Sequence, residues 1–190
     1  MGRPIEFLGL PCPIQRIVGN GAFQTTAQFM STKETLEIST DEKTWLISIK
    51  SCDQERDGQF IRDLTRENFY DSFTQTIGWN ENRHREEPKF PERYLMLFAE
   101  KKCIGFLSLR DQSDCLYLET LQLIQQVRGR GIGAALMKFV EGIASKRGKD
   151  RIQLKVFKDN PAQSLYRRTG FKVIEDQGWC LLMQKVLEPS

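Results

Sequence analysis

Apolar and polar residues follow two different periods along the chain, and these periods divide it into predicted strands and helices. Apolar side chains alternate with polar ones over residues 44–50, which predicts a strand. Between residues 53 and 77 they recur at every third, fourth or fifth position, which predicts two helices that meet near Thr65. The same analysis predicts further strands over residues 94–100, 103–110, 115–124, 152–157, 172–175 and 179–186.

The most regular helical pattern covers residues 131–147. Its apolar side chains recur at intervals of three and four positions and form one continuous face: Ile132, Ala135, Leu136, Phe139, Val140, Ile143 and Ala144. A shorter helix is predicted between Asn160 and Gly170, with Asn160 as its N-cap and Gln163 in the capping-box position. This order of elements predicts an α/β fold, with a mixed sheet of about seven strands, flanking helices and one parallel crossover.

The first 43 residues differ from the rest of the chain. Glycine and proline are frequent as far as Gly21, acidic residues are absent between Glu6 and Glu34, and no helix or strand period is sustained. We therefore expect a loosely ordered extension over residues 1–43 and one domain over residues 44–190. A targeting segment and a translation start at Met30 are alternatives that the sequence leaves open.

Composition and charge argue against several classes of protein. The 28 Lys and Arg residues nearly balance the 25 Asp and Glu residues, and a net charge of +3 is weak for a dedicated nucleic-acid binder. One histidine cannot build a His-rich metal site, and five cysteines without a Cys-x-x-Cys pair favour neither a zinc ribbon nor a disulfide framework. No apolar run approaches the roughly 20 residues that span a bilayer. We therefore expect a cytoplasmic protein with no metal, membrane or nucleic-acid partner, and a homodimer is compatible with the sequence.

The segment Arg128-Gly129-Arg130-Gly131-Ile132-Gly133, here called the glycine turn, joins a predicted strand to the long amphipathic helix. Glycines let main-chain N–H groups approach a ligand closely. The helix start has no Ser, Thr, Asp or Asn cap. Its first turn also has no acidic residue, although a negative charge there normally interacts favourably with the helix dipole. The sequence therefore favours an external phosphate or diphosphate at this helix end over a solvated turn.

Two other phosphate-binding motifs fit the glycine turn poorly. A Walker A loop needs Gly-Lys followed by Ser or Thr, which the turn lacks. Gly129, Gly131 and Ala134 satisfy the dinucleotide pattern G-x-G-x-x-A, and Asp150 lies about twenty residues further on. However, Gly129 does not directly follow the predicted strand, and the chain beyond it is too short for further βαβ units.

The glycine turn resembles the phosphate loop of the GNAT superfamily of acetyl-CoA-dependent N-acetyltransferases, Q/R-x-x-G-x-G/A. Arg128, Gly131 and Gly133 fill this pattern. A second segment, residues 154–171, resembles the strand and helix that end many of these enzymes. The two motifs stand in the family's order and at its separation, and the resemblance covers residues 44–187.

The resemblance implies how the site is built. A splayed sheet would hold acetyl-CoA between the strands predicted over 115–124 and 152–157. Tyr166 would protonate the departing CoA thiolate, and an aromatic core residue is the alternative role for it. The residues assigned to the cofactor are Leu121, Gln122, Leu123, Arg128, Gly129, Arg130, Gly131, Ile132, Gly133, Ala134 and Asn160.

The resemblance defines the catalytic base and the acceptor site less well. Glu119 lies on the strand beside the cleft, and alternation places it on the same side as Leu121 unless a bulge intervenes. Glu81 is the alternative base, and Trp79 would then close an apolar substrate-binding site. His84 is expected in a solvated, charged loop.

Together these features predict an acyltransferase. It would be an N-acetyltransferase that moves the acetyl group of acetyl-CoA to a primary amine, of a small molecule or a peptide, by direct attack. The alternative is a non-catalytic module that binds or senses acetyl-CoA. Tyr166 favours the enzyme, because a sensor needs no proton donor.

Overall fold

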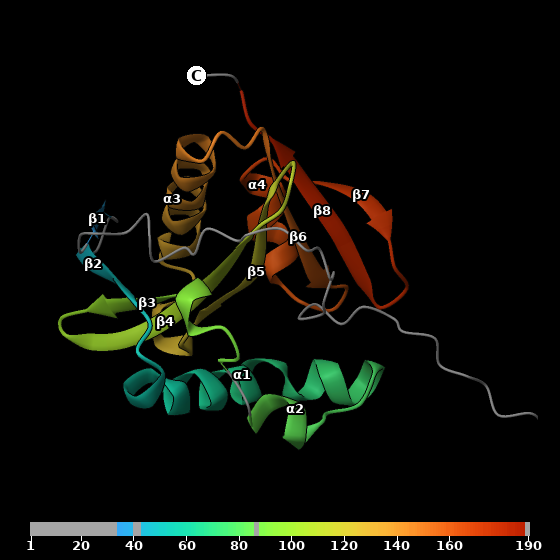
Figure 1. Cartoon of the computed structure of the whole chain (residues 1–190), viewed down its shortest axis with the longest axis horizontal. Coiled ribbons are helices and arrows are strands. Elements are labelled where there is room, and N and C mark those ends of the chain that lie inside the picture. Colours follow the sequence, from blue (N-terminus) through green and yellow to red (C-terminus); the bar gives the residue numbers. More distant parts are fainter. Residues whose placement is uncertain (1–33, 40–42, 86–87, 189–190) are drawn as a thin grey trace, which may run out of the picture.

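The computed structural model describes residues 34–39, 43–85 and 88–188, which form one mixed sheet with helices on both faces (Figure 1). The sheet has eight strands in the order β1-β2-β3-β4-β5-β6-β8-β7, and only β5 and β6 are parallel neighbours. The strands are β1 (Glu34–Ser39), β2 (Thr44–Ser51), β3 (Tyr94–Ala99), β4 (Lys102–Asp111), β5 (Leu116–Leu123), β6 (Arg151–Phe157), β7 (Lys172–Asp176) and β8 (Cys180–Val186). The helices are α1 (Gln54–Thr76), α2 (Glu81–Arg85), α3 (Ile132–Lys146) and α4 (Ala162–Arg168), with short 3-10 turns η2 (Pro91–Arg93) and η3 (Gln125–Val127). The predicted α/β class is therefore confirmed.

Strand β1 lies inside the segment that was expected to be a loose extension. It pairs with β2 along its whole length, from Glu34 opposite Ile49 onward. Ile38 is buried and Leu36 packs against the core, so a short alternation is enough to form this edge strand. The sheet consequently has one strand more than predicted, and the extension before residue 34 lies outside the described residues.

Residues 54–76 form a single helix, α1, where the sequence predicted two helices. Asp53 caps its start, because Oδ1 accepts a hydrogen bond from the amide N–H of Arg56 at 3.1 Å. No proline interrupts the segment, and Thr65 is buried against the sheet, so the helix continues through the expected break. One long helix thus covers the face of the sheet on which Phe106 lies (Figure 1).

Helix α3 covers the opposite face of the sheet. Its buried side chains Leu136, Met137 and Val140 belong to the larger hydrophobic core, together with side chains of seven strands, β1 to β6 and β8. The apolar stripe predicted for residues 131–147 is therefore confirmed as the side that faces the core. Because α1 and α3 lie on opposite faces, a gap in the sheet between them can be lined from both sides.

Strands β5 and β6 leave such a gap. Their parallel ladder ends at Leu118 opposite Leu154. Strand β5 continues to Leu123 and β6 to Phe157 without further pairing between them. The two strands therefore diverge as the splayed sheet predicted, and main-chain groups along the gap are free of a strand partner on that side.

A bulge in β5 changes the direction of its side chains. The register of β5 on β4 shifts between Ser108 and Leu109, and Glu119 is the extra residue on β5. Leu121 packs against the larger core on the α3 face. Glu119 instead accepts a hydrogen bond from Ser108, which lies on the α1 face with Phe106. The bulge that the sequence left open is therefore present, and Glu119 and Leu121 do not share one side.

Candidate active site

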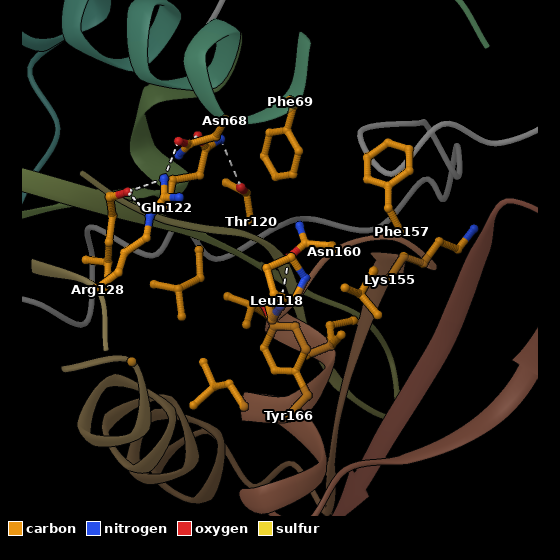
Figure 2. A pocket seen from close by; sticks show the side chains of 18 of the residues that line it. Asn68, Phe69, Leu118, Thr120, Gln122, Arg128, Lys155, Phe157, Asn160 and Tyr166 are labelled. Atoms are coloured by element: carbon orange, nitrogen blue, oxygen red, sulfur yellow. Dashed lines mark hydrogen bonds between the residues drawn. The ribbon is translucent and has the colours of Figure 1, made fainter. Parts of the chain in front are cut away.

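A cavity of about 590 Å³ occupies the gap between β5 and β6 (Figure 2). Residues 118–123 of β5 and 154–157 of β6 line it without interruption. We call its two ends the turn end, formed by the glycine turn and α4, and the α1 end, formed by α1 and the ends of β6 and β8. The cavity therefore connects the two faces of the sheet.

The glycine turn leads into α3 through residues in the left-handed region. Gly129 and Gly131 have φ angles of 73° and 76°, which side chains with a Cβ rarely adopt. The amide of Ala135 donates to the carbonyl of Gly131 at 3.1 Å, so the amides of residues 132–134 have no carbonyl within the helix to bind. Among the described residues, no side chain caps this end and no acid lies in its first turn. The helix start thus favours an anion at the turn end.

The residues assigned to the cofactor in this segment divide into two groups. Five line the cavity: Arg128, Gly129, Gly131, Gly133 and Ala134. Ile132 is buried in the core, and Arg130 donates to the carbonyl of Gln126 at 3.2 Å with its guanidinium 5.7 Å from the Trp45 ring. Ile132 can therefore offer only its main chain, and the Arg130 side chain lies outside the cavity wall.

The guanidinium of Arg128 is engaged by the protein itself. Its Nε and Nη2 donate to the carbonyl of Leu123 at 3.0 and 2.9 Å, and Nη2 also donates to Oδ1 of Asn68. Arg128 still lines the cavity at the turn end. The side chain thus joins the end of β5 to α1 while its positive charge remains beside the glycine turn.

Thr65, Asn68, Gln122 and Arg128 form a hydrogen-bonded chain from α1 to the glycine turn, which we call the Asn68 network (Figure 2). Asn68 Nδ2 donates to Gln122 Oε1 at 3.1 Å. Gln122 Nε2 donates to the hydroxyls of Thr65 and Thr120 at 3.1 and 3.2 Å. Because Gln122 is buried, its amide group needs these partners. Gln122 was assigned to the cofactor, and only its main chain is therefore available to bind it.

The sequence analysis overlooked the α1 side of the cavity. Thr65, Asn68 and Ser72 stand at positions i, i+3 and i+7 and form a polar stripe along α1. Phe69 and Phe73 lie beside this stripe and line the same cavity. Polar residues at helical spacing beside apolar ones on a helix were the signal that could have identified this wall.

Asn160 lies in the turn before α4 and lines the cavity (Figure 2). The helix begins at Ala162 with Pro161 at the N-cap, one residue later than predicted. Asn160 Oδ1 still accepts a hydrogen bond from the amide of Ala162 at 2.8 Å. The predicted capping box is wrong, because Gln163 Nε2 donates instead to the carbonyls of Phe157 and Lys158, at 3.3 and 2.6 Å.

Tyr166 lies on α4 and lines the cavity where β5 and β6 separate (Figure 2). Its ring is 5.9 Å from that of Phe171, so the side chain also belongs to the core. Burial raises the pKa of the Tyr166 hydroxyl to about 12. The hydroxyl therefore stays protonated at neutral pH, and the catalytic and core roles considered for Tyr166 are compatible.

Glu119 lines the cavity from the bulge in β5. Its carboxylate accepts a hydrogen bond from the Ser108 hydroxyl at 2.9 Å. It also pairs with Arg110 Nε at 2.9 Å and Arg93 Nη1 at 3.5 Å, and its side chain is 16% exposed. The group is thus a half-buried carboxylate held in place by three neighbours.

The structure does not place Trp79 and Glu81 in the cavity wall. Trp79 stacks on His84 with ring centroids 3.9 Å apart and an interplanar angle of 11°, and it packs edge-on near Phe73. Glu81 pairs with Arg66 at 2.9 Å on the surface. The expectation of a solvated His84 is wrong, because the side chain is buried in this aromatic cluster.

The described residues also bear on metal ions, membranes and disulfides. They contain no group of three or more His, Cys, Asp or Glu residues that could hold a metal ion. In this part of the chain, helices long and apolar enough to cross a membrane are absent. The four cysteines within it, Cys52, Cys103, Cys115 and Cys180, are free thiols.

Comparisons with known proteins place this arrangement in context. Residues 58–171 match the profile of the acetyltransferase (GNAT) family. PaiA N-acetyltransferase from Thermoplasma acidophilum, solved with coenzyme A, is 24% identical over 74% of this chain and 98% of its own, with a TM-score of 0.60. A GNAT-family acetyltransferase from Listeria monocytogenes is 16% identical over 80% and 100%, with a TM-score of 0.58. N-acetylglutamate synthase from Neisseria gonorrhoeae, solved with coenzyme A and N-acetyl-glutamate, is 16% identical over 75% of this chain and 35% of its own, with a TM-score of 0.58. At these identities the structural similarity establishes a common fold.

Proposed function

The chain belongs to the acetyltransferase (GNAT) family and uses acetyl-CoA as its co-substrate, and we propose that it acetylates a primary amine by direct attack on the thioester. The observation that carries this proposal is the continuous cavity between β5 and β6. It extends from the uncapped helix start at the turn end to the side chains of the α1 end. A donor at one end and an acceptor at the other would meet inside the sheet, beside Tyr166.

The turn end fits the diphosphate of acetyl-CoA. The unpaired amides of residues 132–134 are N–H donors for it, and the helix dipole adds to their effect. Arg128 adds a positive charge, and Gly133 keeps the amides accessible because it has no side chain. Along the gap, main-chain groups of residues 121 and 122 are available to the pantetheine arm, whereas Arg128 holds the carbonyl of Leu123. Asn160 lies on the opposite wall.

The amine must lose a proton before or during its attack. An alkyl amine has a pKa near 10.4, so roughly one molecule in two thousand is uncharged at pH 7. Glu119 is the lining carboxylate on β5, and we assign it as the base that takes this proton, directly or through water. Ser108 and Arg110 hold it in one orientation.

Tyr166 supplies the proton for the thiolate that leaves when the carbon–sulfur bond breaks. An ordinary thiol pKa is about 8.5, below the pKa of about 12 that burial gives Tyr166. Transfer from Tyr166 is therefore favourable only when it accompanies loss of the proton from the attacking nitrogen. Glu119 takes the proton from nitrogen, Tyr166 gives one to sulfur, and solvent restores both groups.

A thiol-release assay with acetyl-CoA and a panel of amines and peptides tests this function. We expect release of CoA thiol that depends on the amine, together with a mass gain of one acetyl group on the acceptor. Glu119→Gln should lower the rate by about 10²-fold, the lower end of the effect of one general base. Saturable binding of acetyl-CoA without transfer to any amine would instead support the binding or sensing module.

A further inference from the structure

The α1 end of the cavity has an aromatic wall, which consists of Phe69, Phe73, Phe157 and Trp179. Phe157 stands at its centre, with ring centroids 6.0 Å from Phe69, 5.2 Å from Phe73 and 5.3 Å from Trp179. Phe69 and Phe157 are seen beside the cavity in Figure 2. Phe69 and Trp179 are partly exposed and offer apolar surface on the α1 side, and the buried rings of Phe73 and Phe157 support them.

Charges are distributed unequally between the two ends of the cavity. Among the described lining residues, the two arginines are Arg128 of the glycine turn and Arg168 of α4, both at the turn end. The α1 end has the carboxylates of Glu119 and Asp159. Lys155 also lines the cavity, but Figure 2 shows its ammonium pointing away from the other labelled side chains.

Among the described residues, the two arginines beside Glu119 are already engaged. Arg93 and Arg110 both pair with Glu119, and neither is among the lining residues. Asp159 accepts a hydrogen bond from the Ser72 hydroxyl at 3.0 Å, which joins the turn after β6 to α1. Among the described lining side chains, a carboxylate brought beside Glu119 and Asp159 would therefore lose water without meeting a cation that faces it, and such a loss is unfavourable.

We propose that the acceptor amine is carried on an apolar or aromatic body and has no carboxylate beside the amine. This inference rests on the proposed acetyl transfer. The apolar body would lie against the aromatic wall while the nitrogen reaches past it toward Glu119 and Tyr166. Apolar burial favours such a body by about 25 cal/mol for each Å² removed from water.

Three simple amines test the proposal with the intact protein. Phenylethylamine and ethylamine differ by the ring, and phenylalanine is phenylethylamine with a carboxylate added beside the amine. We expect kcat/KM, expressed per uncharged amine, to be at least about tenfold higher for phenylethylamine than for ethylamine. It should exceed the value for phenylalanine by about tenfold or more as well.

Variants of the aromatic wall test its role directly. Phe157→Leu and Phe69→Leu should each lower the phenylethylamine-to-ethylamine ratio of kcat/KM by about threefold or more, because part of the ring contact is lost. Phe139→Leu is the matched control, since Phe139 packs against the larger core and is not among the lining residues. Binding of acetyl-CoA by calorimetry reports whether each variant is folded.

The outcomes separate this inference from the function on which it rests. Acetylation of phenylalanine at least as efficiently as phenylethylamine would overturn the proposed acceptor class while leaving amine acetylation intact. An unchanged ratio in both Phe157→Leu and Phe69→Leu would also overturn it. Absence of transfer to every amine tested, with acetyl-CoA still bound, would overturn the proposed function and this inference together.

Discussion

The two ends of the cavity are built from different parts of the chain. At the turn end the groups that face the cavity are mostly main-chain amides, exposed by Gly129, Gly131 and Gly133 within one short segment. At the α1 end they are side chains from α1, β5, β6 and the start of β8, which are far apart in the sequence. A site made of amides accepts any ligand with the right anion, whereas a site made of side chains selects by shape and charge. Under the proposed function, the first end binds the donor and the second selects the acceptor.

The largest effect is expected where the two ends meet, at Tyr166. Tyr166→Phe removes the proton and keeps the ring, so kcat should fall by about 10²–10⁴-fold while the dissociation constant of acetyl-CoA changes little. Thiol release and calorimetry measure the two quantities separately. Tyr117→Phe is the matched control. Tyr117, on β5, is buried like Tyr166 but does not line the cavity. Unchanged turnover in Tyr166→Phe would remove this residue from the mechanism.

A change at the turn end should affect the donor alone. Gly133→Val places methyl groups over the amides at the start of α3, where a Cβ would already lie 2.9 Å from Leu165 Cδ2. Since a hydrogen bond to a charged group is worth about 1.5–3 kcal/mol, the KM for acetyl-CoA should rise about ten- to hundredfold. The KM for the amine should remain unchanged. Gly142→Val in the same helix, where a Cβ meets nothing within 4 Å, provides the control.

The Asn68 network connects the two ends of the cavity, so loss of one of its hydrogen bonds should weaken binding at both ends. Asn68→Ala leaves Arg128 and Gln122 each without one partner. We expect the KM values for acetyl-CoA and amine each to rise about fivefold, in line with about 1 kcal/mol for a hydrogen bond. Steady-state kinetics and thermal unfolding check this, with exposed Asn82→Ala on α2 as control. A lower melting temperature with both KM values unchanged would mean that the network only stabilises the fold.

Alkaline pH should weaken the fold before it alters the chemistry of Tyr166. Burial raises the pKa of the Cys103 and Cys115 thiols from 9.0 to about 11. A folded pKa above the unfolded one means that the folded state holds its proton more tightly, so this stabilisation is complete below pH 9 and is lost as the pH rises toward 11. Urea unfolding under reducing conditions should show a loss of at least about 1 kcal/mol between neutral pH and pH 10.5. Cys115→Ala should make this loss of unfolding free energy smaller. An equal loss in the variant would contradict the role given to the Cys115 thiol.

The same comparison explains what the sequence could predict. The glycine turn depends on residues within one segment, because the missing cap, the left-handed angles and the open amides all follow from local residue types. The divergence of β5 and β6 and the position of Tyr166 were predicted from the family resemblance, which rests on two sequence motifs. These features could therefore be predicted from sequence and lie where expected.

The α1 end could not be predicted in the same way. Trp79 and Glu81 were assigned by their place along the chain, but Trp79 packs on His84 and Glu81 on Arg66. The bulge at Glu119 depends on how β5 pairs with β4, which no local pattern encodes. Asn68 acquires its partners only when α1 lies against β5. Each of these features depends on a tertiary contact rather than on local spacing.

The short ladder between β5 and β6 divides the sheet into two parts, with β1 to β5 on one side and β6, β8 and β7 on the other. Within this ladder, the pairing of residues 116–118 with 152–154 is the hydrogen-bonded connection between the two parts. An extended ligand bound along the gap between β5 and β6 would form hydrogen bonds with both strands, as an additional strand would. Amide hydrogen exchange along the gap would then report binding, because amides that bind the ligand exchange more slowly while it is bound.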